Sequence, residues 1–255
     1  MTRTMRTLTA AGAVAAALLM PTPARAQTKP EFGSRGEFIL SADRLVPLVS
    51  WSRIAQDDLN GGDTSTTTTQ TSFSFFWGST APQEVFFSVP RVGLDYTIVP
   101  NVTIGGNVTV FFTAGSNTST TTTVDNGAMT TSGDNGGLFV FGIEPRAGYI
   151  LRLNDMFAFW FRGGFSFYTG TASSPKRDDG SYSHDNTNQF ALDLEPQFVF
   201  TPVSHFGLTA TLDGDIPIAG QHSHTDFAGN GTSNETSASS SMAFVGLTLG
   251  MIGYF

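Results

Sequence analysis

The chain has 255 residues, 12% of them aromatic, no cysteine, and a formal net charge of −8 at pH 7. Without cysteine it can form no disulfide, so its stability must come from secondary structure and core packing. The acidic balance argues against a nucleic-acid-binding protein.

The first 26 residues have the pattern of a secretory signal peptide. Arg3 and Arg6 precede an apolar stretch without a polar face, which argues against a soluble amphipathic helix, and Ala24-Arg25-Ala26 supplies a small-residue cleavage site. We therefore predict a mature chain of residues 27–255, which keeps ten basic and 21 acidic residues for a net charge of −11. No cysteine follows the cleavage site, which excludes a lipid-anchored lipoprotein, and no later run reaches the ~18 apolar residues of a membrane helix.

Eight tracts of the remaining chain alternate apolar and polar residues, which is the period of a β-strand. They run approximately over residues 36–54, 85–99, 101–115, 137–152, 155–171, 187–202, 205–220 and 241–255. Three connections are tight turns, near residues 100, 153 and 203. The other four are polar and low in complexity, and we expect them to be long loops: 55–84, 116–136, 172–186 and 221–240. Strict alternation of short and long connections puts all long loops on one side of the sheet and both termini on the other.

In each tract the apolar side chains share one face and the polar side chains share the other. The tract 155–171, for example, places Phe159, Phe161 and Phe165 opposite Arg162 and Ser166. The first tract fits less well. Asp43 falls on its polar face, so Arg44 would point outward unless a bulge or a rim position accommodates it.

Such alternation fits a soluble sandwich with its phenylalanines inside, or a membrane barrel with its phenylalanines outside. Three features favour the barrel. Lysine, which solvated edge strands normally carry, occurs after the signal only at Lys29 and Lys176, both outside the tracts. The polar faces mix glycine, threonine and opposed charges, which suits a narrow, packed lumen. Outward aromatic residues near the tight turns would form an interfacial girdle: Tyr96, Tyr149, Phe157, Phe200, Phe206 and Phe255.

In lipid every backbone N–H and C=O must be paired within the protein, so a sheet that spans the membrane has to close. We therefore predict an all-β fold for residues 27–255, an eight-stranded antiparallel up-and-down transmembrane β-barrel. Its first strand pairs with its last, and Phe255 anchors that last strand at the membrane interface.

The signal peptide, the eight tracts and the final strand together resemble the small OmpA-like outer-membrane β-barrel proteins of Gram-negative bacteria. The closing strand of that family carries a polar residue, a glycine and two aromatic residues, which the barrel-assembly machinery reads. Thr248, Gly250, Tyr254 and Phe255 are similar to this signal, although Gly253 stands where the first aromatic residue is expected. The resemblance implies an outer-membrane protein in contact with lipids including lipopolysaccharide, with extracellular loops and periplasmic termini. It implies no particular activity and no particular ligand.

The inward faces define the best candidate site, a polar network in the lumen. Its members are Glu37, Asp43, Arg91, Asp95, Glu144, Arg146, Arg162, Asp193, Glu195, Asp213 and Asp215. Side chains fill the interior of so narrow a barrel, and buried charges need partners, so we expect a structural plug of ion pairs. The alternative is a narrow, porin-like path for small solutes, which the surplus of acids would make selective for cations.

Two features of the long connections remain. His222, His224 and Asp226 fall on one side of an extended segment, with His184 and Asp185 on the connection before it, which makes them weak candidates for a divalent metal site. They do not reproduce the patterns of barrel enzymes that act on lipid A or peptides, and we expect neither catalysis nor a cofactor. The segment that holds Phe73, Phe75, Phe76 and Trp77 is too apolar for a free loop. It predicts a hairpin above the membrane, a cover for the barrel mouth or, less favoured, a binding patch.

Overall fold

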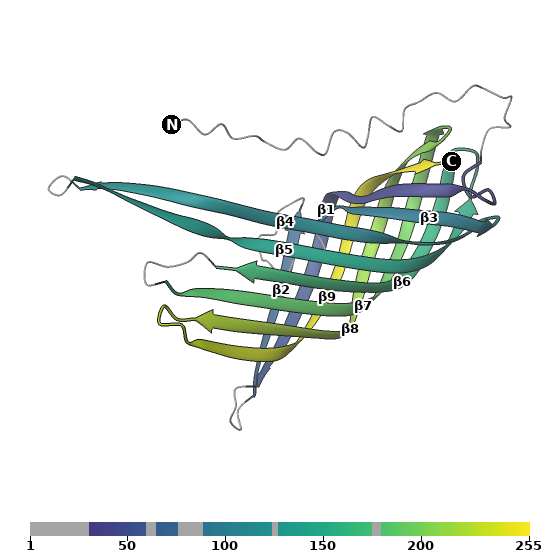
Figure 1. Ribbon diagram of the computed structural model, residues 1–255. Helices are drawn as coiled ribbons and strands as arrows, with labels where there is room; N and C mark the ends of the chain where they lie inside the picture. The colour runs from purple at the N-terminus through teal and green to yellow at the C-terminus, as the bar shows by residue number, and fades with distance from the viewer. Residues whose placement is uncertain (1–30, 60–64, 76–88, 124–126, 175–179) are drawn as a thin grey trace. The chain divides into compact units, whose positions relative to one another are not determined.

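The computed structural model describes residues 31–59, 65–75, 89–123, 127–174 and 180–255, so the predicted signal peptide lies outside the described residues. These residues form strands and no helix long and apolar enough to cross a membrane. The strands are β1 (Phe38–Leu59), β2 (Ser65–Phe75), β3 (Arg91–Val99), β4 (Val102–Thr123), β5 (Gly127–Arg152), β6 (Phe157–Ser173), β7 (Tyr182–Val203), β8 (Phe206–Phe227) and β9 (Ser233–Tyr254) (Figure 1).

Eight strands close into a ring, as the sequence predicts. Each pairs with the next in the antiparallel order β1-β3-β4-β5-β6-β7-β8-β9, and β9 pairs with β1. The closure runs from Ile39 opposite Tyr254 up to Asp58 opposite Ala238. At the C-terminal end of β9, just past Tyr254, Phe38 and Phe255 exchange two backbone N–H···O bonds of 2.9 Å. The barrel therefore has no free edge along this seam.

The outer face is apolar and the inner face is largely polar, the reverse of a soluble protein. On β6, Phe161 and Phe165 are 47% and 50% exposed, whereas Arg162 and Ser166, on the other face, are buried. On β3, buried and exposed residues alternate from Arg91 to Ile98. Lipid-facing and lumen-facing side chains alternate in this way in membrane barrels. The phenylalanine rows thus face outward, and the sandwich alternative is wrong.

The polar connections are largely β-hairpins rather than loops, and here the sequence prediction was wrong. β4 and β5 stay paired as far as Thr123 opposite Gly127, and β8 and β9 as far as Phe227 opposite Ser233. In Figure 1 the β4–β5 hairpin runs on well beyond β6 and β7. Threonine is β-branched and favours extended backbone, so a threonine-rich polar segment can form a strand.

The first connection adds a ninth strand. β2 pairs with the upper part of β1, from Val49 opposite Phe75 to Leu59 opposite Ser65. Phe73, 60% exposed, lies opposite Trp51. The apolar residues of this connection therefore extend a hairpin, the first of the three alternatives, while Phe76 and Trp77 lie outside the described residues.

Two clusters of apolar side chains fill the lumen near its two ends. The turn-side layer, near the short turns, consists of Phe32, Ile39, Ile150, Ala158, Trp160, Val199, Ile252 and Tyr254. The hairpin-side layer, toward the long hairpins, consists of Ile54, Val140, Tyr168, Met242 and Phe244, with Phe111 and Leu138 packed against it. The sequence predicted a polar lumen, because the alternating tracts were interpreted as apolar outside and mainly polar inside. It did not show that the inward apolar residues gather in two layers.

Candidate functional site

Between the two apolar layers, the inward faces of six strands gather charged side chains into one cluster. Its four arginines and seven carboxylates are at most 5% exposed: Asp43, Arg44, Arg91, Asp95, Glu144, Arg146, Arg162, Asp193, Glu195, Asp213 and Asp215. We call this set the charged layer. It contains every residue that the sequence placed in the lumen except Glu37, and it adds Arg44.

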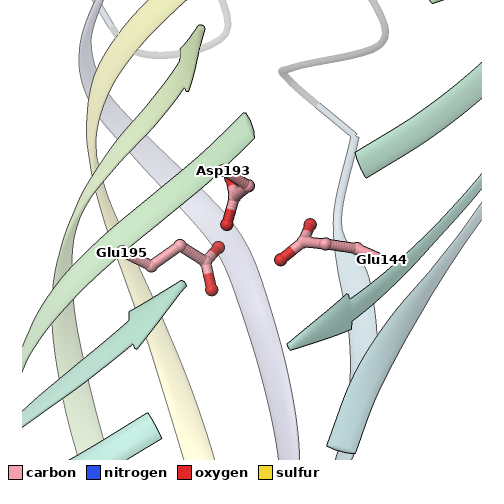
Figure 2. Close-up of side chains that lie close together, drawn as sticks. All are labelled: Glu144, Asp193 and Glu195. Carbon is pink, nitrogen blue, oxygen red and sulfur yellow. The ribbon is translucent and has the colours of Figure 1, made fainter. Parts of the chain in front are cut away.

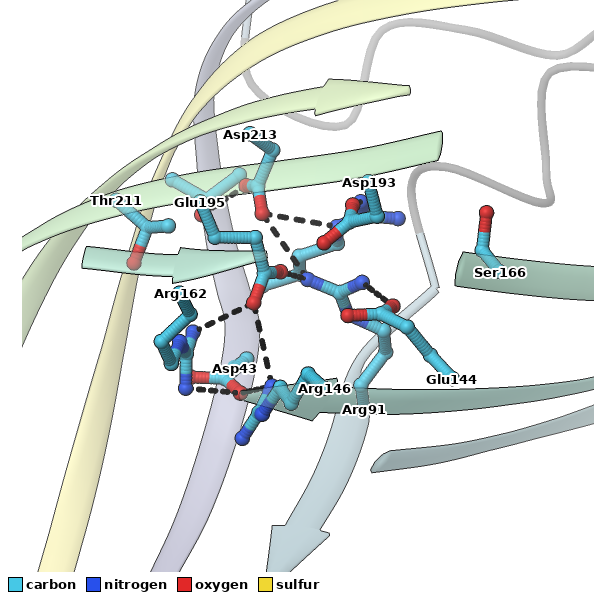
Figure 3. A network of polar contacts seen from close by, with 12 residues as sticks. Asp43, Arg91, Glu144, Arg146, Arg162, Ser166, Asp193, Glu195, Thr211 and Asp213 are labelled. Atoms are coloured by element: carbon cyan, nitrogen blue, oxygen red, sulfur yellow. Dashed lines mark hydrogen bonds and ion pairs between the residues drawn. The ribbon is translucent and has the colours of Figure 1, made fainter. Parts of the chain in front are cut away.

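Glu195, on β7, is the hub of the charged layer (Figure 3). Its Oε2 lies 3.2 Å from Arg146 Nη1 and 3.0 Å from Arg162 Nη2, and its Oε1 accepts a hydrogen bond from Arg91 Nη2. Charge-assisted bonds to guanidinium groups are the strongest hydrogen bonds that a buried carboxylate can accept. Glu195 therefore links side chains from β3, β5 and β6 to β7.

Arg146 crosses the lumen from β5 to β3. Its Nε and Nη2 bind Asp95 at 3.1 and 2.7 Å, a bidentate pair, and its Nη1 lies 3.3 Å from Asp43. A Cβ at Gly93 would lie 2.5 Å from Arg146 Nη2. Glycine at position 93 thus makes room for this guanidinium group.

Arg44 enters the lumen through a β-bulge, one of the two solutions that the sequence required. Its φ is +55°, and the register between β1 and β9 shifts between Ala42 and Val46. Two consecutive residues, Asp43 and Arg44, consequently point inward. Arg44 Nη2 then lies 3.1 Å from Asp215 Oδ2. In the sequence, the break in alternation at Asp43 and Arg44 was the only signal of this bulge. It did not indicate whether Arg44 would point into the lumen or outward.

The apolar layers contact the guanidinium groups directly. The Trp160 ring centroid lies 4.7 Å from Arg162 Cζ and 5.9 Å from Arg146 Cζ, on the turn side. The Phe244 centroid lies 5.3 Å from Arg44 Cζ, on the hairpin side. Both arrangements are cation–π contacts. The charged layer is therefore enclosed by aromatic rings toward both ends of the barrel.

The other residues that the sequence singled out lie at the turn-side end of the barrel and along the seam between β1 and β9. Glu37 accepts a hydrogen bond of 2.7 Å from the Gly33 N–H and so holds the segment before β1. Among the residues of the predicted assembly signal, Thr248 donates to Asp213 at 2.7 Å, whereas Tyr254 is buried in the turn-side layer and Phe255 is exposed. A Cβ at Gly250 would lie 2.6 Å from the Ala42 carbonyl oxygen, so a side chain there would disturb the seam.

The histidines of the β8–β9 hairpin gather around Asp185 rather than around Asp226. Asp185 Oδ1 lies 2.7 Å from His224 Nδ1 and 3.5 Å from His222 Nε2, and His224 Nε2 lies 3.3 Å from Asp226. On β8, Ile218 is the last exposed large apolar side chain before His222, so this group lies beyond that apolar row. The hydrogen bond to Asp185 raises the pKa of His224 above its usual value. The sequence placed Asp185 nearby without showing that it sits between the two rings.

No model of a known protein family matches the chain, and no curated protein sequence matches it. Several solved structures are similar in fold. Outer membrane protein OprG from Pseudomonas aeruginosa is 10% identical, with 87% of this chain and 97% of that chain covered and a TM-score of 0.49. Ail, the attachment invasion locus protein of Yersinia pestis, is 12% identical over 87% and 99%, with a TM-score of 0.38. A major outer membrane protein from Thermus thermophilus is 12% identical over 81% and 99%, with a TM-score of 0.41. Similarity this distant says nothing of activity, so the function must be argued from the residues of this chain.

Proposed function

We propose that this protein is a non-catalytic, non-conducting barrel of the outer membrane, which anchors long β-hairpins at the cell surface. The apolar outer face supports insertion into a bilayer, and closed barrels of this kind are typical of outer membranes. In this orientation the hairpins are extracellular and the short turns periplasmic. The hairpins, rich in serine and threonine, serve a structural or surface-interaction role.

The observation that carries the proposal is the sealing of the lumen. An ion crossing the barrel would have to pass the turn-side layer, the charged layer and the hairpin-side layer in turn. Trp160, Tyr168 and Met242, which belong to the apolar layers, are all fully buried. In the charged layer, the arginines cross-link the carboxylates of neighbouring strands. A small barrel filled by side chains in this way has no room for a water column.

Two partners follow from this placement. The outer face and the hairpin bases would contact membrane lipids including lipopolysaccharide, with the outward aromatic residues at the interface. The last strand, with Thr248, Gly250, Tyr254 and Phe255, would be read by the barrel-assembly machinery before the seam with β1 closes.

Conductance in planar bilayers tests the proposal. The wild-type barrel should show no discrete current steps under voltage. A matched variant with Trp160→Ala and Phe244→Ala, which loses one aromatic ring from each apolar layer, should leak. Because the charged layer holds more carboxylates than guanidinium groups, that leak should favour cations. Steady currents through the wild type, unchanged in the variant, would overturn the proposal.

A cation-preferring pore is the second candidate, since the acidic surplus favours it. Discrete current steps through the wild-type barrel in the same bilayers would establish it.

A barrel enzyme is the third candidate. Asp185 and His224 form an exposed acid–base pair on the hairpin side, so altered lipid A or peptide cleavage that disappears with His224→Ala would establish catalysis.

A further inference from the structure

The charged layer is not electrically balanced. Its seven carboxylates face four guanidinium groups, which leaves three negative charges uncompensated if all groups are ionised. Buried charges that lack a partner are costly, because the apolar layers keep bulk water away from them. The surplus must therefore be neutralised by something other than the side chains of this layer.

Asp193 is the carboxylate with the weakest compensation. It is fully buried, and the nearest guanidinium nitrogen, Arg44 Nη2, lies 4.0 Å from its Oδ1, beyond hydrogen-bond distance. Within the described part of the chain, neither of its oxygens has a hydrogen-bond partner, and Oε1 of Glu144 has none either. By contrast, Glu195, two residues along the same strand, contacts three arginines.

Asp193 and Glu144 lie close to Glu195 across the lumen. Glu144 on β5 and Asp193 and Glu195 on β7 each offer an oxygen, and the three oxygens lie within 4.8 Å of one another (Figure 2). Arg91 Nη1 binds Glu144 Oε2 at 2.5 Å, and Arg91 Nη2 binds Glu195 Oε1. This arginine fixes two of the three carboxylates, and each carboxylate retains lone pairs for a further partner.

We propose that Glu144, Asp193 and Glu195 bind a divalent, oxygen-preferring cation such as Ca²⁺ or Mg²⁺ inside the barrel. Carboxylate oxygens are the ligands that these hard cations select, whereas copper and zinc prefer nitrogen or sulfur. Such an ion removes two of the three surplus charges. Because apolar layers close both ends of the lumen, the ion enters while the strands assemble and is then retained. This site is independent of any activity of the hairpins.

Metal analysis of the refolded barrel tests the site. The chain is folded into detergent micelles with Ca²⁺, with Mg²⁺ or with EDTA, then freed of loose ions by gel filtration. We expect one equivalent of metal per folded chain after refolding with one of the two ions, and a higher urea midpoint than after refolding with EDTA, since an ion bound only by the folded state stabilises it. Folded barrel that retains no metal under either condition would overturn the proposal.

Two variants separate a specific site from loose binding. Asp193→Asn should fold, as judged by the same shift of its SDS-gel band on boiling. It should retain no metal, and its urea midpoint should be the same after refolding with the cation and with EDTA. Asp215→Asn, whose carboxylate instead binds Arg44 and Ser166, should retain the metal. Equal retention in both variants would show that the ion lies elsewhere. Wild-type barrel refolded with Ca²⁺ could instead contain no metal and show a protonated-carboxyl infrared band that is absent from Asp193→Asn. That result would show that a proton takes the place we assign to the cation.

Discussion

The most informative substitution is Glu195→Gln, compared with Asp193→Asn on the same strand. Both remove one buried carboxylate charge and keep the side chain's shape. Glu195 contacts Arg91, Arg146 and Arg162, whereas among the described residues only Arg44, at 4.0 Å, lies within ion-pair distance of Asp193. The first substitution therefore removes a shared partner of three buried cations, and the second removes surplus negative charge.

Breaking a buried ion pair by removing one partner costs roughly 3–5 kcal/mol, and the remaining amide oxygen of glutamine places this case near the lower limit, about 3 kcal/mol. With an m-value of about 2 kcal/mol per molar urea, the unfolding midpoint of Glu195→Gln should fall by about 1.5 M. Asp193→Asn should keep the wild-type midpoint or exceed it when both are measured in EDTA.

The assay is urea unfolding in lipid vesicles, followed by tryptophan fluorescence. Coincident unfolding and refolding curves would serve as the control for equilibrium. If the two variants lost equal stability, or if Glu195→Gln lost none, Glu195 would not be the hub of the charged layer.

Two further predictions concern single positions. Gly164→Ala should greatly reduce the yield of folded barrel, because its Cβ would lie 2.1 Å from the Pro145 carbonyl oxygen. Gly163→Ala, whose Cβ would have Leu194 at 3.3 Å as its nearest contact, should fold. Equal amounts of the folded SDS-gel band, the one that shifts on boiling, in the two variants would contradict this. Asp185→Asn should lower the pKa of His224 in an NMR titration. Because the pKa of His224 is raised in the folded protein, the stabilisation from this pair is complete below the pKa of the unfolded state and disappears as pH rises through the pKa of the folded state. An unchanged titration of His224 in the variant would refute the pairing.

The alternation of side chains was enough to predict the closed eight-stranded ring and the inward charges. Phe161 and Arg162 differ by one position, and a strand must place them on opposite faces. Alternation does not report strand length where both faces are polar. The threonine-rich segments were therefore interpreted as loops, although backbone pairing continues to Thr123 and Gly127.

Pairing inside the lumen could not be predicted, because it depends on the register between strands. Arg91 and Glu195 are 104 residues apart and meet only because the ring closes. Arg44 required a positive φ, which its sequence does not signal as glycine would. Inward apolar residues such as Ile150 and Met242 lie within tracts that otherwise fit the pattern, so the sealing of the charged layer appears only in three dimensions.

The closed membrane barrel is the central claim, and heat modifiability tests it most directly. The chain, folded into detergent micelles, is run on SDS gels with and without boiling, alongside circular dichroism. We predict a compact, SDS-resistant band that shifts on boiling, together with a β-sheet spectrum. A soluble monomer that folds without detergent and migrates identically with and without boiling would contradict the account.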